Sequence, residues 1–207
     1  MASTLPSWLI LDWIEGIVSL KDDSITELVA ALSSAERQAR ESAARELYRR
    51  GRELAESAIV KWRTEPEIGK LLSDHATVGI VVTPEHFFAI RKALGNPRLA
   101  QVPPDQDAEE FEWDAGDGAH LDILTTRELG GTGAIARFLA KMGEGIQQVE
   151  FLTPDVTRAA ELIHTRLGIA AIYPSTRAGA DGTRVNFFLT DVPNGKKILI
   201  ELVEKTR

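Results

Sequence analysis

The chain has 207 residues and no cysteine, and its 31 acidic side chains outnumber 24 basic ones, which gives a formal net charge of −7. The absence of cysteine excludes disulfide scaffolds, thiolate zinc sites, iron–sulfur clusters and cysteine nucleophiles. The negative charge argues against nucleic-acid binding, which depends on surplus Lys and Arg. The first 20 residues lack the basic start of a secretory signal, and no apolar run reaches the roughly 18 residues of a membrane span. We therefore expect a cytoplasmic protein without nucleic-acid or membrane partners.

Residues 1–74 are predicted to be helical. The stretch 34–62 contains one Gly and no Pro, and it is rich in Ala, Glu and Arg, which are strong helix formers. Its apolar stripe is thin and predicts close packing, either on the chain's own core or on a second subunit in a homodimer. The stripe consists of Ala43, Leu47, Leu54, Ala58 and Trp62. Arginines at 45, 49, 50 and 52 alternate with glutamates, which favours a solvated, salt-bridged face over a basic patch.

A different pattern begins near residue 75. A β-rich segment at 77–82 is followed by Thr83-Pro84-Glu85, a typical helix start, and this helix is expected to end at Leu94-Gly95. Three strands are then predicted at 98–102, 108–114 and 119–125, because turn residues separate these β-rich segments.

The same order of elements then repeats. A strand at 148–152 leads into Thr153-Pro154-Asp155, the helix is expected to end at Leu167-Gly168, and strands are predicted at 169–173, 184–190 and 197–203. The sequence therefore predicts an α+β protein of two tandem βαβββ modules behind an all-helical N-terminal extension. We expect boundaries at 1–74 for the extension, 75–129 and 146–207 for the modules, and 130–145 for a linker with a short helix.

Strand alternation sorts the side chains of the modules onto two faces of the sheet. One face is apolar and is expected to lie under the helices. The other face carries Thr77, Glu110, Glu112, Asp122, Gln148, Glu150 and Glu201. Two interpretations fit a polar face of this kind: exposure to solvent, or a curved sheet that closes around a site.

Several segments resemble the methylmalonyl-CoA epimerases of the vicinal-oxygen-chelate superfamily, which also includes glyoxalases, bleomycin-resistance proteins and extradiol dioxygenases. The similar segments are Ala134–Lys141, Gly143–Phe151, Asp155-Val156, Gly182–Phe188 and Ile198–Glu204. The resemblance covers about residues 75–204 and leaves the N-terminal helices without a counterpart. It implies that the two modules enclose a cleft, where a divalent metal polarises a carbonyl and a carboxylate removes a neighbouring proton.

The resemblance also implies which residues form the site. The four metal-ligand positions fall on Thr77, Asp122, Gln148 and Glu201, and the catalytic carboxylates on Glu110 and Glu201, with Glu112 or Glu150 as alternative bases. The family usually has His at the first and third ligand positions. Loss of both imidazoles weakens binding of zinc, cobalt and nickel, so we expect a metal bound weakly through oxygen or not at all.

One alternative metal site uses different residues. His75 and His120 lie two positions before Thr77 and Asp122, so a site shifted along the strands would use both histidines and Asp122.

Three functions remain open from the sequence. The first is an epimerase, isomerase or lyase that acts on a small acid or thioester through an enolate-like intermediate. The second is a small-molecule-binding protein of the bleomycin-resistance type, without catalysis. The third is an assembly or regulatory protein that uses its N-terminal helices. The clustered Trp8 and Trp13 motivate this hypothesis.

Overall fold

The computed structural model describes residues 23–192 and 197–206, so Trp8 and Trp13 lie outside the described residues. The helices are α2 (Asp23–Ala31), α3 (Arg37–Ala58), α4 (Val60–Thr64), α5 (Pro66–Gly69), α6 (Pro84–Ala93), α7 (Ala134–Met142) and α8 (Val156–Leu167), with a short 3-10 turn, η1, at Ala180–Gly182. The strands are β1 (Ala76–Val81), β2 (Glu109–Asp114), β3 (His120–Thr125), β4 (Gly145–Leu152), β5 (Arg177–Ala178), β6 (Arg184–Asp191) and β7 (Lys197–Glu204). Among the described helices, none has the length and apolar character needed to cross a membrane.

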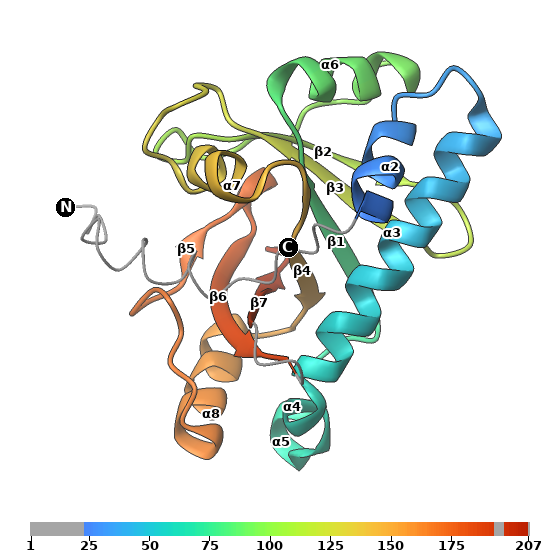
Figure 1. Cartoon of the computed structure of the whole chain (residues 1–207). Coiled ribbons are helices and arrows are strands. Elements are labelled where there is room, and N and C mark those ends of the chain that lie inside the picture. The colour runs from blue at the N-terminus through green and yellow to red at the C-terminus, as the bar shows by residue number, and fades with distance from the viewer. Residues whose placement is uncertain (1–22, 193–196, 207) are drawn as a thin grey trace.

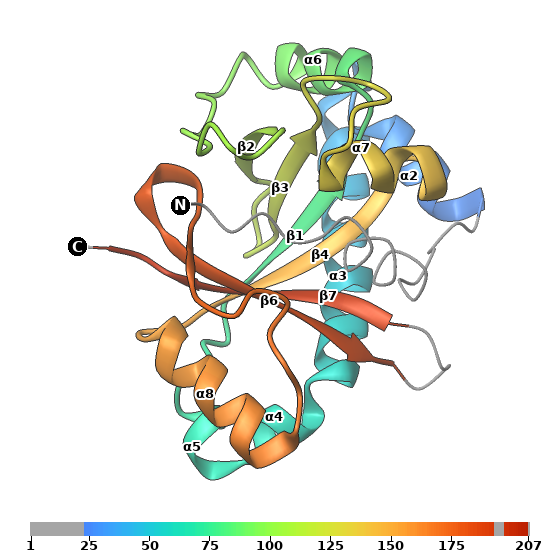
Figure 2. The same cartoon turned by 90° about the vertical axis from the view of Figure 1, so that its left-hand side faces the viewer.

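The seven strands form one mixed sheet in the order β2-β3-β1-β4-β7-β6-β5. Strands β1 and β4 pair antiparallel at its middle (Figure 2). Strand β1 also pairs in parallel with β3, and β4 pairs in parallel with β7. Each half of the sheet therefore pairs its first strand with its last, and the predicted α+β architecture of the vicinal-oxygen-chelate type is confirmed.

Helix α3 lies along one side of the sheet, and α7 lies on the other side (Figure 1). The predicted stripe of α3 packs on the chain's own core, because Ala43 and Leu47 are buried together with the sheet residues Val78 and Val149. A Cβ atom on Gly51 would lie only 2.6 Å from Val78 Cγ1, so a residue without a side chain is needed for this close approach. The predicted homodimer through the N-terminal helices stays a prediction.

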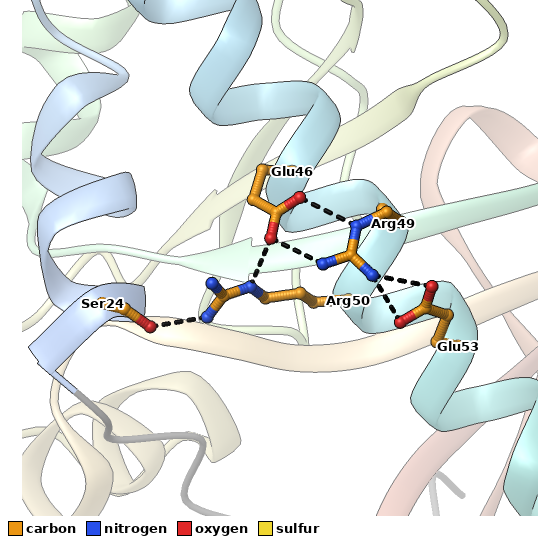
Figure 3. A network of polar contacts seen from close by, with 5 residues as sticks. All are labelled: Ser24, Glu46, Arg49, Arg50 and Glu53. Atoms are coloured by element: carbon orange, nitrogen blue, oxygen red, sulfur yellow. Dashed lines mark hydrogen bonds and ion pairs between the residues drawn. The ribbon is translucent and has the colours of Figure 1, made fainter.

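The outer surface of α3 carries an ion-pair network (Figure 3). Arg49 contacts Glu46 and Glu53 at 2.7 Å each, and Arg50 contacts Glu46 at 2.7 Å and Ser24 of α2 at 2.6 Å. The alternating charges therefore neutralise one another on a solvated helix face, as the sequence indicated, and they tie α2 to α3.

Two predicted strands are wrong. Residues 98–102 are irregular because loop contacts occupy their polar groups: the Gln101 amide donates to Asp181, and Arg98 binds the same carboxylate. Residues 169–173 are also irregular and make one backbone bond to β6, from the Ile172 amide to the Phe187 carbonyl at 2.7 Å. The division of the chain into an extension, two modules and a linker at residues 74, 129 and 145 stays a prediction.

Candidate functional site in the cleft of the sheet

The sheet curls around a cleft of about 810 Å³ on the face opposite α3. Both halves of the sheet line it, and α7 and the loops before β2 and β6 complete the wall. Of the seven polar residues that alternation placed on one face, all except Thr77 line this cleft: Glu110, Glu112, Asp122, Gln148, Glu150 and Glu201. The interpretation of a curved sheet around a site therefore describes this face better than simple solvent exposure does.

The middle of the cleft floor depends on a glycine. Gly79 of β1 lies opposite Asp122 of β3 on one side and Gln148 of β4 on the other. A Cβ atom on Gly79 would lie 2.7 Å from Gln148 Cγ and 3.2 Å from Leu124 Cδ1. The bare backbone at this position lets the Gln148 side chain lie flat across the floor.

Gln148 and Glu201 are joined directly. The Gln148 Nε2 group donates a hydrogen bond of 2.5 Å to Glu201 Oε2, and the side chains are 7% and 8% exposed. Beside them, Asp122 and Glu150 lie close enough to affect the acidity of each other. Polar groups from β3, β4 and β7 thus form a nearly continuous cluster, although they lie far apart in the sequence.

Two carboxyl groups of the cleft, Glu110 and Glu150, have raised pKa values. Burial raises the pKa of Glu110 to about 7, and the nearby charges of Asp181 and Glu112 add to the effect. Burial, with the charges of Glu112 and Glu110, likewise raises the pKa of Glu150 to about 7. Removal from water disfavours the charged form of a carboxyl group, and neighbouring carboxylates disfavour it further.

Asp122 and Glu201 lie deeper in the same cluster. Burial raises the pKa of each well above its ordinary value, and the charges of Glu150 and Glu110 act in the same direction. Both groups therefore favour the protonated, neutral form more strongly than a carboxyl group in water does.

The four positions expected to bind metal do not form a metal site. Gln148 directs its NH₂ group, which cannot bind a cation, at Glu201, and Thr77 does not line the cleft. Within residues 23–192 and 197–206, no group of three or more His, Asp or Glu side chains has an arrangement that could hold a metal ion. The side chains therefore do not fit the metal that the resemblance implies.

The alternative, shifted site is only partly assembled. The rings of His75 and His120 meet edge to face with their centroids 4.4 Å apart. Asp122 lies in the cleft, which neither histidine lines. The structure thus brings the two histidines together, but in the described part of the chain they form no group of three with a carboxylate that could hold a metal ion.

Two cleft residues were missed by the analysis of the sequence. Gln147 follows Ile146, and simple alternation would place it on the face opposite Gln148. A β-bulge in the pairing of β1 with β4 near Gly79 breaks this alternation, so both glutamines line the cleft. Arg137 of α7 also lines it. No pattern in the sequence signals the bulge, since it depends on pairing with a distant strand.

One wall of the cleft is closed by contacts between the two halves of the molecule. Asp181 binds the Arg98 guanidinium at 2.5 Å and accepts a hydrogen bond of 2.9 Å from the Gln101 amide. Arg177 pairs with Asp105 at 2.6 Å, and its guanidinium lies 4.5 Å from the centre of the Tyr173 ring. These contacts connect the loop before β2 to the segment before β6 and give the cleft a defined rim.

Comparison with known proteins finds similarity in structure. No protein-family model and no curated protein sequence matches the chain. A methylmalonyl-CoA epimerase from Mycobacterium tuberculosis is 27% identical with a TM-score of 0.51, over 66% of this chain and 89% of that one. A variant of the Streptomyces coelicolor epimerase in complex with 2-nitronate-propionyl-CoA is 25% identical with a TM-score of 0.51, over 66% and 99%.

A further epimerase structure, in complex with methylmalonyl-CoA and NH₄⁺, is 26% identical with a TM-score of 0.51, over 65% of this chain and 96% of that one. These matches confirm the resemblance seen in the sequence: the chain has the vicinal-oxygen-chelate fold and is structurally similar to methylmalonyl-CoA epimerases.

Proposed function

We propose that this structural relative of the methylmalonyl-CoA epimerases is an isomerase of the epimerase type. It removes a proton from the carbon next to a carbonyl group and returns one to the opposite face, and its substrate is a small acid or acyl thioester. The single observation that carries the proposal is Glu110, a carboxyl group in the cleft wall with a pKa of about 7. A general base works best when its pKa lies near the working pH. Two of the epimerase structures described above contain acyl-CoA ligands, which supports this class of substrate.

The second group needed for epimerisation is an acid. Glu201 comes from the other half of the sheet, and burial raises its pKa well above the ordinary value, which favours the protonated form. Gln148 Nε2 donates to one oxygen of this carboxyl group, which leaves the other oxygen to carry the proton. We therefore assign Glu110 as the base that removes the proton and Glu201 as the acid that returns one to the opposite face of the carbon.

Negative charge that develops on the substrate oxygen needs hydrogen-bond donors. The protonated forms of Asp122 and Glu150 can supply them, because a neutral carboxyl group donates one O–H hydrogen bond. No step of this proposal passes through a metal ion. If a cation binds, the oxygen donors Asp122 and Glu201 suit magnesium, calcium or manganese better than zinc.

The test is proton exchange in heavy water. Methylmalonyl-CoA is incubated with the protein in D₂O, and loss of the signal of its α-proton is followed by NMR, with EDTA or with added Mn²⁺. We expect exchange in wild type and a loss of about 100-fold or more in Glu110→Gln, the usual size for removal of a general base. Glu109→Gln is the matched control, since the neighbouring Glu109 on β2 does not line the cleft.

Absence of exchange in both metal conditions would contradict the enzymatic proposal. One observation favours a second function, ligand binding without catalysis: the Gln148–Glu201 hydrogen bond occupies two of the positions at which the family binds metal. Tight binding of methylmalonyl-CoA in EDTA, without exchange, would support that function instead.

A further inference from the structure

We propose that Arg137 and Gln147 determine the specificity of the cleft by binding a carboxylate group on the acyl part of the ligand. The inference rests on the proposed function, because it concerns the same cleft. It assigns the part of the cleft next to α7 to charge recognition and leaves the carboxyl cluster to proton transfer.

Arg137 forms no ion pair with the residues that the structure describes. Its side chain lines the cleft, and its Nε atom is buried without a hydrogen bond to any of these residues. In the part of the chain that the structure describes, its guanidinium makes no ion pair, whereas Arg177 on the same cleft pairs with Asp105 and stacks on Tyr173. Arg137 is half-buried, and a cation that is partly removed from water is stabilised by an anionic partner, so its guanidinium is suited to bind an anion. Its planar donors match the two oxygens of a carboxylate.

Gln147 provides an independent indication of a ligand. The residue is only 3% exposed and lines the cleft, and its Oε1 atom has no hydrogen-bond partner within residues 23–192 and 197–206. Buried amide groups are nearly always hydrogen-bonded in native structures. As placed, Oε1 can accept a hydrogen bond from the O–H of a carboxylic acid. A half-turn of the amide presents the NH₂ group instead, which can donate to a carboxylate oxygen.

The start of α7 lies in the same wall. Residues 132–135 line the cleft, and the residue at the N-cap position, Gly133, has no side chain to satisfy the free amides of the first turn. These amides and the helix dipole favour an anion. Asp107 lies nearby and opposes this effect, but its carboxylate already accepts hydrogen bonds from Thr126 Oγ1 and the Arg127 amide.

The rest of the cleft favours one orientation of the ligand. The carboxyl groups of Glu110, Glu150 and their neighbours disfavour a second negative charge beside them. A ligand that carries a carboxylate is therefore expected to place it toward Arg137 and its reacting carbon toward Glu110.

The experiment compares two ligands that differ in one carboxylate. Isothermal titration calorimetry measures the affinity of methylmalonyl-CoA and of propionyl-CoA for wild type, Arg137→Met and Gln147→Glu. Wild type is expected to prefer methylmalonyl-CoA by about 10- to 100-fold, the range expected for hydrogen bonds to a charged group. Both variants should lose most of this preference. Lys141→Met is the matched control, because it removes the same charge from the exposed side of the same helix.

Three results would overturn the inference. They are equal or absent binding of the two ligands by wild type, an unchanged preference in Arg137→Met, and an equal loss of affinity for both ligands in Arg137→Met. The last result would place a phosphate of CoA, and not the acyl carboxylate, at Arg137. Circular dichroism confirms that each variant is folded, and Arg137→Lys, which keeps the charge, should retain part of the preference.

The experiments distinguish a failure of this inference from a failure of the proposed function. Binding is measured without turnover, so a protein that prefers the carboxylate ligand but exchanges no proton contradicts the enzymatic proposal alone. A protein that exchanges protons but shows no preference contradicts the carboxylate site alone.

Discussion

Replacement of Glu110 by Gln should change the stability of the protein in a manner that depends on pH. Glu110 has a pKa of about 7 in the folded protein, raised from an ordinary value of 4.5 by burial and by the charges of Asp181 and Glu112. The unfolded chain exposes the same carboxyl group to water, so it keeps the ordinary value there. Gln has a similar shape and no charge at any pH.

The sign of the effect follows from the direction of the pKa change. The folded protein holds the Glu110 proton more tightly than the unfolded chain does, so the free energy of unfolding falls as the pH rises from about 4.5 to about 7. A rise of this size corresponds to a loss of about 3 kcal/mol, which is an upper limit because the neighbouring carboxyl groups titrate together with Glu110. Glu110→Gln removes this loss.

The assay is urea unfolding followed by circular dichroism at pH 5 and pH 8. The free energy of unfolding of Glu110→Gln relative to wild type should increase by up to about 3 kcal/mol between these values of pH. Glu109→Gln, on the same strand but outside the cleft, should show no such increase. A difference between Glu110→Gln and wild type that stays constant with pH would refute the assignment of a raised pKa to Glu110.

Three further predictions test other parts of the structure. Gly51→Val should lower the free energy of unfolding by about 2 kcal/mol, measured by urea unfolding, because its Cβ would overlap Val78; an unchanged stability would contradict the close packing of α3 on β1. Gly79→Ala should displace Gln148 and weaken binding of methylmalonyl-CoA in calorimetry, and an unchanged affinity would show that the position of Gln148 is unimportant. EDTA should change the affinity for methylmalonyl-CoA less than twofold, whereas strict dependence on added Mn²⁺ would show that the oxygen donors assemble a metal site after all.

The polar face of the sheet could be predicted because strand alternation is a local property. A period of two residues places Glu110, Asp122, Gln148 and Glu201 on the face opposite the buried apolar residues wherever the strands pair. The same rule failed at Gln147, because the bulge that turns this residue into the cleft arises from pairing with β1. It also could not exclude Thr77 from the cleft, since that depends on how far the curved sheet extends.

The two wrong strands have a related cause. The β-rich composition of residues 98–102 and 169–173 is compatible with an extended chain, but composition does not decide which partner binds the backbone. Asp181, more than 80 positions away from Arg98, binds the Arg98 guanidinium and the Gln101 amide of the first segment. Because of these contacts, the segment forms part of the rim of the cleft and does not form a strand.

The sequence by itself determined that a strand, a helix and further strands occur twice in succession, and it determined the apolar and polar faces, because these depend on residue type and on spacing along the chain. The resemblance to a known family added the expected ligand positions, at which the sequence has no histidine. Only the tertiary structure decided what the polar face does. Burial within a curled sheet raises the pKa of Glu110, and a long-range contact joins Gln148 to Glu201. The position of α7 places Arg137 in the cleft, where its Nε atom has no hydrogen bond to the described residues. Acidity and pairing depend on the distances between groups and on their removal from water, and both are set only when distant strands and helices come together.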